Sequence, residues 1–196
     1  WSNGFDKIVT AIAGGDALDV VELGNTWVAS FADKGALENM DSFYKKYGKN
    51  YIGWNTTYYK RSYYSVPWLL GTRAMFYNLE LFEKAGLNPD NPPVTWDDVL
   101  KAAAKIDALG PDIYGFGLPS GESYSPWQQW FLPAVWCTGG DIISEDGKKA
   151  LLISPRVNQT AEFYRKLAKN SLKTKQDDLA KAFGEGKVGM YVSGAW

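Results

Sequence analysis

The sequence predicts an α/β protein, because short apolar runs that suit strands alternate with longer amphipathic segments that suit helices. Strand-like runs occupy residues 18–23, 73–77, 113–118 and 187–192, and helical patterns lie between them. Glycines and prolines stand at most of the boundaries, where they end helices and form turns. The alternation, the two periodicities and the placement of the breakers together indicate this fold class.

The first 64 residues contain three such elements and a weakly patterned region. Apolar residues at helical spacing predict a helix over 2–13, which Gly14 and Gly15 end. The run Leu18 to Leu23 predicts a short buried strand, and a turn at 24–26 leads into a helix over 27–34. We expect short helices and loops over residues 38–64, which are polar and aromatic.

The middle of the chain has clearer boundaries between its predicted elements. Residues 65–70 predict an extended segment, 73–77 a strand, and 78–85 a helix that stops at Gly86. Thr95 is the expected N-cap of the next helix, which has acidic residues in its first turn and runs to Leu109.

The last third continues the alternation. A strand over 113–118 leads through a loop at 119–125 into a Trp-rich helix over 126–138, in which we expect Trp130 and Trp136 to pack inward. The elements that follow are a hairpin-like segment over 139–147, a helix from Pro155 to Asn170, a helix over 176–183 and the strand 187–192.

Composition excludes several classes of function. The chain has 196 residues, 45% hydrophobic and 22% charged, which suits one large or two small globular domains. With 21 basic and 22 acidic residues, it shows no electrostatic footprint for nucleic acid. Histidine is absent, which removes the commonest transition-metal ligand and the usual general base. We therefore expect no zinc hydrolysis and no Ser-His chemistry, and we expect no metal and no cofactor.

Other features of composition leave alternatives open. No apolar run approaches the ~20 residues that span a bilayer, and the single Cys137 excludes an internal disulfide. An aromatic content of 15% indicates either a large aromatic core or a binding surface of ring faces. The chain opens at Trp1 without an initiator Met or a signal segment, so we expect a mature or truncated piece of a longer protein.

Three glycines near strand 113–118 could suggest a phosphate-binding loop. Gly115, Gly117 and Gly121 have the spacing GxGxxxG, and Pro119 interrupts it. This spacing fits neither the dinucleotide pattern nor the P-loop, so we expect no nucleotide site.

Three stretches resemble one family when they are taken in order. They are AGGDALDVVELGNTWVASFADKGAL (13–37), SVPWLLGTRAMFYNLELFEKAGLNPDNPPVTW (65–96) and FGEGKVGMYVSGAW (183–196). They resemble the sugar-binding, maltose-binding-protein-like group of ABC-importer extracellular solute-binding proteins. The resemblance implies a periplasmic-binding-protein-like two-lobe fold of type II, incomplete at both ends. Residues 1–64 would be part of lobe one, 65–72 a crossing or hinge segment, and 73–196 most of lobe two.

The resemblance also implies where a ligand is held. In the family, the tryptophan after the Gly-x motif, Trp196 in this chain, stacks on a sugar ring; its alternative is a place in the core. For Trp68 in the crossing segment, the same two roles are possible: ligand contact or a place in the core. One stacked face that hides on the order of 80 Å² of apolar surface gives roughly 2 kcal/mol.

Polar candidates lie in three other places. Asn25, Thr26 and Trp27 follow the first strand, although Asn25 or Thr26 could instead cap the next helix. Arg73 could serve sugar hydroxyls, an anionic sugar or an interlobe ion pair, and relatives often carry a carboxylate near it. The loop after strand 113–118 supplies the candidates Glu122, Tyr124, Trp127 and Gln128.

The implied function is a receptor that binds a sugar or oligosaccharide in an interlobe cleft and delivers it to ABC permease subunits. The receptor would be periplasmic or extracellular, associated with the membrane through the transporter or a lipid anchor, and would close by a hinge motion. Two alternatives stay open. One is a carbohydrate-active hydrolase, for which Glu22 and Glu122 could be nominated; the other is a truncated lobe that only folds or self-associates.

Overall fold

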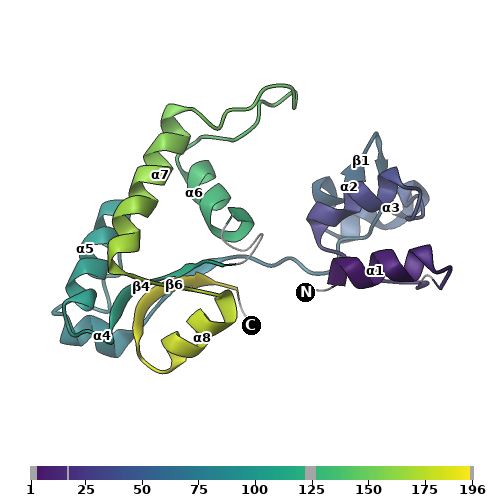
Figure 1. Ribbon diagram of the computed structural model, residues 1–196. Coiled ribbons are helices and arrows are strands. Elements are labelled where there is room, and N and C mark those ends of the chain that lie inside the picture. The colour runs from purple at the N-terminus through teal and green to yellow at the C-terminus, as the bar shows by residue number, and fades with distance from the viewer. Residues whose placement is uncertain (1–3, 17, 122–126, 195–196) are drawn as a thin grey trace. The chain divides into compact units, whose positions relative to one another are not determined.

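The structure, a computed structural model, describes residues 4–16, 18–121 and 127–194. The chain forms two compact units, Trp1–Gly71 and Thr72–Trp196 (Figure 1). Within the described residues, no helix combines the length and the apolar content that a bilayer crossing requires.

The first unit is small and mostly helical. Its elements are α1 (Gly4–Ala13), α2 (Asn25–Asp33), α3 (Asp41–Tyr47), the short 3₁₀ turns η1 (Gly48–Asn50) and η2 (Trp54–Thr57), and a hairpin of β1 (Tyr58–Tyr59) and β2 (Ser62–Tyr63). Phe5 of α1 packs against Trp27 and Phe31 of α2, with ring centroids 5.4 and 5.2 Å apart. The predicted first helix and the short helices over 38–64 are confirmed.

A cluster of rings around Trp54 holds the second half of this unit together. Trp54 is buried, and its indole Nε1 donates to the carbonyl oxygen of Gly48 at 2.9 Å. Tyr44 of α3 lies edge-on to it at 5.0 Å and stacks on Tyr63 of β2 at 4.1 Å. Ring packing therefore ties α3 to the hairpin.

The predicted strand over residues 18–23 is wrong. These residues form bends and irregular backbone, and Leu18 and Val20 are exposed, Val20 to 89%. A strand forms only where a neighbour accepts and donates its backbone hydrogen bonds. Among the described residues of the first unit, the β1–β2 pair is the only sheet, and it does not reach this segment.

The second unit is an α/β domain, as the sequence predicts. Its elements are β3 (Ala74–Tyr77), α4 (Leu79–Lys84), α5 (Trp96–Asp107), β4 (Tyr114–Pro119), the π-helical turn η3 (Trp127–Phe131), α6 (Leu132–Cys137), α7 (Pro155–Leu167), η4 (Ala168–Asn170), β5 (Ser171–Thr174), α8 (Gln176–Gly184) and β6 (Val188–Ser193). The strands are ordered β3-β6-β4-β5, with β4 parallel to both β5 and β6 and with β3 antiparallel to β6. Strand β5, Ser-Leu-Lys-Thr, was not predicted because it is short and polar.

Helix starts follow the predicted chemistry. Thr95 accepts from the backbone N–H of Asp98 at 3.1 Å, and the Asp98 carboxylate accepts from the backbone N–H of Thr95, which completes a capping box. The hydroxyl of Thr95 also donates to Asp98, and these bonds lower the pKa of that carboxyl. Asn78 and Ser154 cap α4 and α7 by accepting from the backbone N–H of Leu81 and Val157 respectively.

One expectation about the Trp-rich helix is wrong. Trp130 is buried edge-on against Phe116 of β4, with centroids 5.2 Å apart, as expected. Trp136 is 51% exposed, and its Nε1 donates to Asp141 at 3.3 Å. Residues six apart on a helix of 3.6 residues per turn point roughly 120° away from each other, so both tryptophans could not face the same core.

Helices cover both faces of the sheet. On one face, Phe116 and Met190 pack with Ile106 of α5 and Leu167 of α7, all nearly or fully buried. On the other face, Leu179 of α8 packs against residues of β6. Figure 1 shows α7 and α8 on opposite sides of the sheet.

At Gly115, the backbone of β4 lies close to the backbone of α5. A Cβ atom at this position would lie 1.9 Å from the carbonyl oxygen of Ala103 on α5. At Gly117, a Cβ would meet Leu179 of α8 at 3.1 Å. The glycines of the GxGxxxG run in β4 thus serve helix–sheet packing.

We predict that Gly115→Ala lowers the free energy of unfolding by about 3 kcal/mol or more, because a backbone carbonyl cannot yield as a side chain can. Urea unfolding measures the change. Gly110→Ala is the matched control, since a Cβ at Gly110 meets nothing within 4 Å. Equal stability of the two variants would contradict the packing role of Gly115.

Candidate functional site

Three strands of the second unit end at one edge of the sheet. Because β4, β5 and β6 are parallel, their last residues Pro119, Thr174 and Ser193 lie at the same edge. Strand β3 runs the opposite way and begins there, with Ala74 paired to Ser193. Open α/β sheets bind ligands in the loops beyond the carboxyl ends of their strands. We call this edge, together with the residues that directly follow β4, β5 and β6 and with Arg73, the carboxyl edge.

A hydrogen-bonded frame fixes two of these strand ends. The backbone N–H of Ser120 donates to the carbonyl oxygen of Thr174 at 2.8 Å, which continues the β4–β5 pairing past the end of β4. The Thr174 hydroxyl donates to the Asp178 carboxylate on α8 at 3.1 Å. The loop after β4 and the start of α8 therefore leave the sheet from a fixed position.

Arg73 lies at this edge, as its place before β3 requires. It directly precedes Ala74, so its backbone adjoins the end of β6. Its side chain is half-buried, and burial lowers the pKa of its guanidinium from the ordinary value. The structure thus holds a cation, with several N–H donors, partly withdrawn from solvent.

Sequence reasoning missed Gln176, the first residue of α8. Its side chain is 8% exposed, and its Nε2 donates to the hydroxyl of the buried Ser193 at 3.3 Å. Its Oε1 is buried and has no hydrogen-bond partner among the described residues. A buried amide oxygen without a partner costs about 1–3 kcal/mol. Such an atom at a strand end is a candidate acceptor for a ligand hydroxyl.

Of the other candidates in this unit, only Trp127 has a described side chain. It is 40% exposed at the start of η3 and stacks on Phe131, with centroids 5.2 Å apart and planes 12° from parallel. Glu122, Tyr124 and Trp196 lie outside the described residues, and only the backbone of Gln128 is described.

The candidates of the first unit lie in two places. Asn25, Thr26 and Trp27 form the first turn of α2, where Asn25 and Thr26 are exposed and Trp27 packs edge-on to Phe5. Gly24 occupies the N-cap position, and no side chain caps the helix. The alternative that Asn25 or Thr26 caps this helix is therefore wrong.

Trp68 lies in the irregular segment that precedes β3. Its side chain is 80% exposed, and the neighbouring Leu69 is 78% exposed. Trp68 therefore does not pack in a core, which was the alternative to ligand contact for this residue.

Two cavities in the second unit lie away from these residues. One of about 220 Å³ lies among α5, α6 and α7 and is lined by Trp96, Phe163 and Gln159 among others. The second, of about 520 Å³, lies at the opposite edge of the sheet, near Tyr114 and Ser171. None of the candidate ligand residues whose side chains are described lines either cavity.

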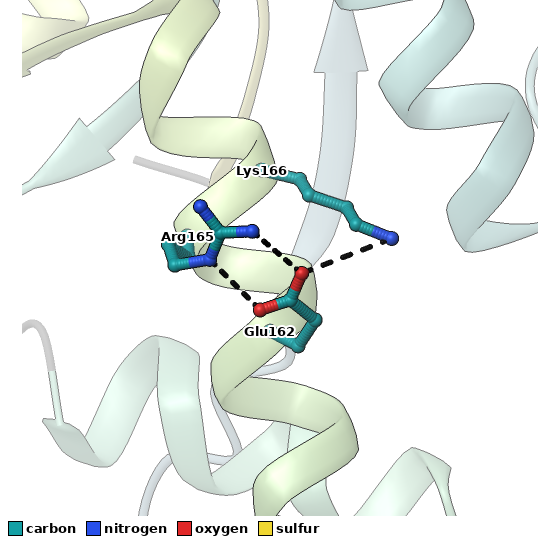
Figure 2. A network of polar contacts seen from close by, with 3 residues as sticks. All are labelled: Glu162, Arg165 and Lys166. Atoms are coloured by element: carbon teal, nitrogen blue, oxygen red, sulfur yellow. Dashed lines mark hydrogen bonds and ion pairs between the residues drawn. The ribbon is translucent and has the colours of Figure 1, made fainter.

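Figure 2 shows an ion-pair network on α7. Two of its residues, Glu162 and Lys166, line the smaller cavity. Arg165 Nε and Nη2 each donate to a Glu162 carboxylate oxygen at 2.8 Å. The Lys166 Nζ atom lies 4.0 Å from Oε1 of Glu162. The paired guanidinium lowers the pKa of Glu162. This carboxylate is therefore ionised and balanced near neutral pH, which does not suit a proton donor.

The pKa shifts of other carboxyl groups also speak against a proton donor. Every carboxyl whose pKa is shifted among the described residues is shifted downward, namely Asp33, Asp41, Glu80, Asp98, Asp146, Glu162 and Glu185. The general acid of a glycosidase requires a raised pKa. Nor does the described part of the chain gather three or more His, Cys, Asp or Glu side chains that could hold a metal ion.

Comparison with known proteins gives consistent matches along the whole chain. Residues 1–196 match the family described as bacterial extracellular solute-binding protein. A binding protein of Brucella abortus (strain 2308) is 31% identical over 98% of this chain and 48% of its own length. The diacetylchitobiose binding protein DasA of Streptomyces coelicolor is 26% identical over 100% of this chain and 46% of its own length.

A solved structure agrees with these matches. The ABC transporter solute-binding protein of Thermotoga lettingae TMO, bound with alpha-D-tagatose, is 36% identical and superposes with a TM-score of 0.86. The match covers 99% of this chain and 52% of that one. The chain thus spans about half the length of the relatives that it matches.

Proposed function

The chain belongs to the bacterial extracellular solute-binding protein family, and from that premise we propose that it binds a sugar or oligosaccharide at the carboxyl edge and serves an ABC importer. The family acts outside the cytoplasm and is not enzymatic. The hydrolase alternative is therefore dropped.

The buried Gln176 amide is the observation that carries this proposal. Its buried Oε1 is a hydrogen-bond acceptor without a partner among the described residues, while Arg73, whose backbone adjoins the same edge, carries N–H donors. A ring of hydroxyls both donates and accepts, so a sugar satisfies this pair of groups better than an apolar ligand. The relatives that bind diacetylchitobiose and alpha-D-tagatose support the same ligand class.

The lobe arrangement is also a proposal. We assign residues 1–64 to lobe one, 65–72 to the crossing segment and 73–196 to lobe two of a type II two-lobe fold. Asn25, Thr26, Trp27 and Trp68 would then contact the ligand from the lobe-one side. Ligand binding would favour a closed state, which the permease subunits recognise. The transporter or a lipid anchor would hold the protein at the membrane.

The competing possibility is that this chain folds or self-associates without binding a solute. Calorimetric titration with a panel of mono-, di- and oligosaccharides separates the two, because a self-associating lobe gives no saturable heat with any sugar.

We predict that Gln176→Met weakens the tightest sugar of that panel by about 1 kcal/mol, roughly fivefold in Kd, because the ligand loses one hydrogen bond while the side-chain volume is kept. Gln159→Met is the matched control, since it removes an amide that lines the cavity among α5, α6 and α7. An effect of Gln159→Met without one of Gln176→Met would move the site to that cavity.

We predict that Trp196→Ala weakens the same sugar by about 2 kcal/mol, close to 30-fold in Kd, through the loss of one stacked face. Trp196→Phe, which keeps a smaller aromatic face, should recover part of this loss. If calorimetry gave an unchanged affinity for Trp196→Ala, Trp196 would not contact the sugar, and the alternative that it packs in the core would hold.

A further inference from the structure

The hairpin of the first unit turns through two residues that are unsuited to the turn. Lys60 and Arg61 have φ angles of 43° and 72°. A two-residue hairpin turn with positive φ at both positions favours Asn-Gly, which adopts this backbone without strain. Residues held in such strain cluster at functional sites, so a functional role for these two cations is worth testing.

Lys60 is held in place by its neighbours on α2. Its Nζ lies 2.6 Å from Oδ1 of Asp33, the hydroxyl of Tyr59 donates to the same oxygen at 2.8 Å, and the ammonium lies 5.1 Å from the centre of the Tyr59 ring. Asp33 is thereby occupied. Arg61 is exposed, and no described residue forms a hydrogen bond or an ion pair with its guanidinium. The tip of the hairpin therefore presents a cation to solvent.

The segment that contains the hairpin is rich in basic residues. Residues 42–71 contain no Asp or Glu, and their basic residues are Lys45, Lys46, Lys49, Lys60 and Arg61. The carboxylate of Asp41, at the start of α3, is occupied by the backbone N–H of Tyr63 and by Asn39. The positive residues therefore have few carboxylates near them.

Exposed rings lie among these cations. Tyr47, Tyr51 and Tyr58 are 37%, 39% and 51% exposed, and Ile52 is 74% exposed. Ring contacts run without a break from Tyr58 through Tyr63, Tyr44 and Trp54 to Tyr51, so the hairpin and α3 are packed together. In Figure 1, β1, α2 and α3 lie together in this unit.

The chemistry of this region fits an extended anionic surface better than a single small anion. Both cavities described above belong to the second unit, whereas these cations are spread over α3, η1 and the hairpin tip. Amphipathic tyrosines among lysines are typical of segments that lie at the membrane–water interface. An acidic protein surface would use the cations but has no special need of the exposed Tyr and Ile side chains.

We propose that this basic aromatic region, made of Lys45, Lys46, Lys49, Lys60, Arg61, Tyr47, Tyr51, Ile52 and Tyr58, binds the anionic lipid headgroups of a bilayer. The first unit then contacts the membrane directly, apart from any transporter or anchor. Arg61 is the exposed cation at the tip of the hairpin, and Asp33 holds Lys60 beside it.

The test is co-sedimentation of the chain with vesicles of phosphatidylcholine alone or with one third phosphatidylglycerol. We expect binding to the anionic vesicles only, and loss of that binding when salt rises from about 0.02 M to about 0.5 M, which shortens the Debye length from about 20 Å to under 5 Å. Lys60→Asn/Arg61→Gly should weaken binding at least about fivefold, the factor expected for one basic residue near the surface. Because Asn-Gly suits the turn, this variant should keep its thermal unfolding midpoint.

Lys148→Gln/Lys149→Gln removes two exposed charges from a turn of the second unit and is the matched control, which should bind as the unchanged chain does. Equal binding to neutral and anionic vesicles, or equal weakening by the two double variants, would overturn the proposal. So would variant-sensitive binding to poly-L-glutamate without binding to vesicles, since the partner would then be an acidic protein surface.

Discussion

The contact between α5 and β4 at Gly115 is the constraint on which the second unit depends. A helix can lie this close to a strand only where a glycine leaves room for the carbonyl oxygen of Ala103. With α5 seated there, Ile106 fills the space over β6 beside Gly189, and the parallel strands keep one alignment. That alignment brings the ends of β4, β5 and β6 to one edge, so the packing of the core decides where a ligand can be held.

The carboxyl edge combines groups that local sequence places far apart. Arg73 arrives from the start of β3, Gln176 from the start of α8 and Ser193 from the end of β6. The strands fix the positions of these backbones, and the hydrogen bond between Gln176 and Ser193 orients the amide, whose buried Oε1 has no partner among the described residues. Neither Arg73 nor Gln176 lines the two cavities elsewhere in this unit, and Glu162, which lines the smaller one, is already paired with Arg165.

Local signals predicted much of the fold, and tertiary context explains the failures. The capping residue Thr95 and the apolar run of β6 need no distant partner to be recognised. Residues 18–23 have the composition of a strand, but a strand also requires a neighbour. Gln176 escaped notice because a glutamine at a helix start normally faces solvent, and its burial comes from β6.

The central claim is that a sugar binds at the carboxyl edge, and ¹H–¹⁵N NMR of the chain during a sugar titration tests it most directly. The account predicts saturable shifts of the Ser120, Gln176 and Ser193 amides and of the Gln176 side-chain NH₂. Signals near Tyr114 and Ser171, at the opposite edge, should stay unchanged. Saturable shifts confined to α5, α6 and α7, around Trp96 and Phe163, would contradict the account.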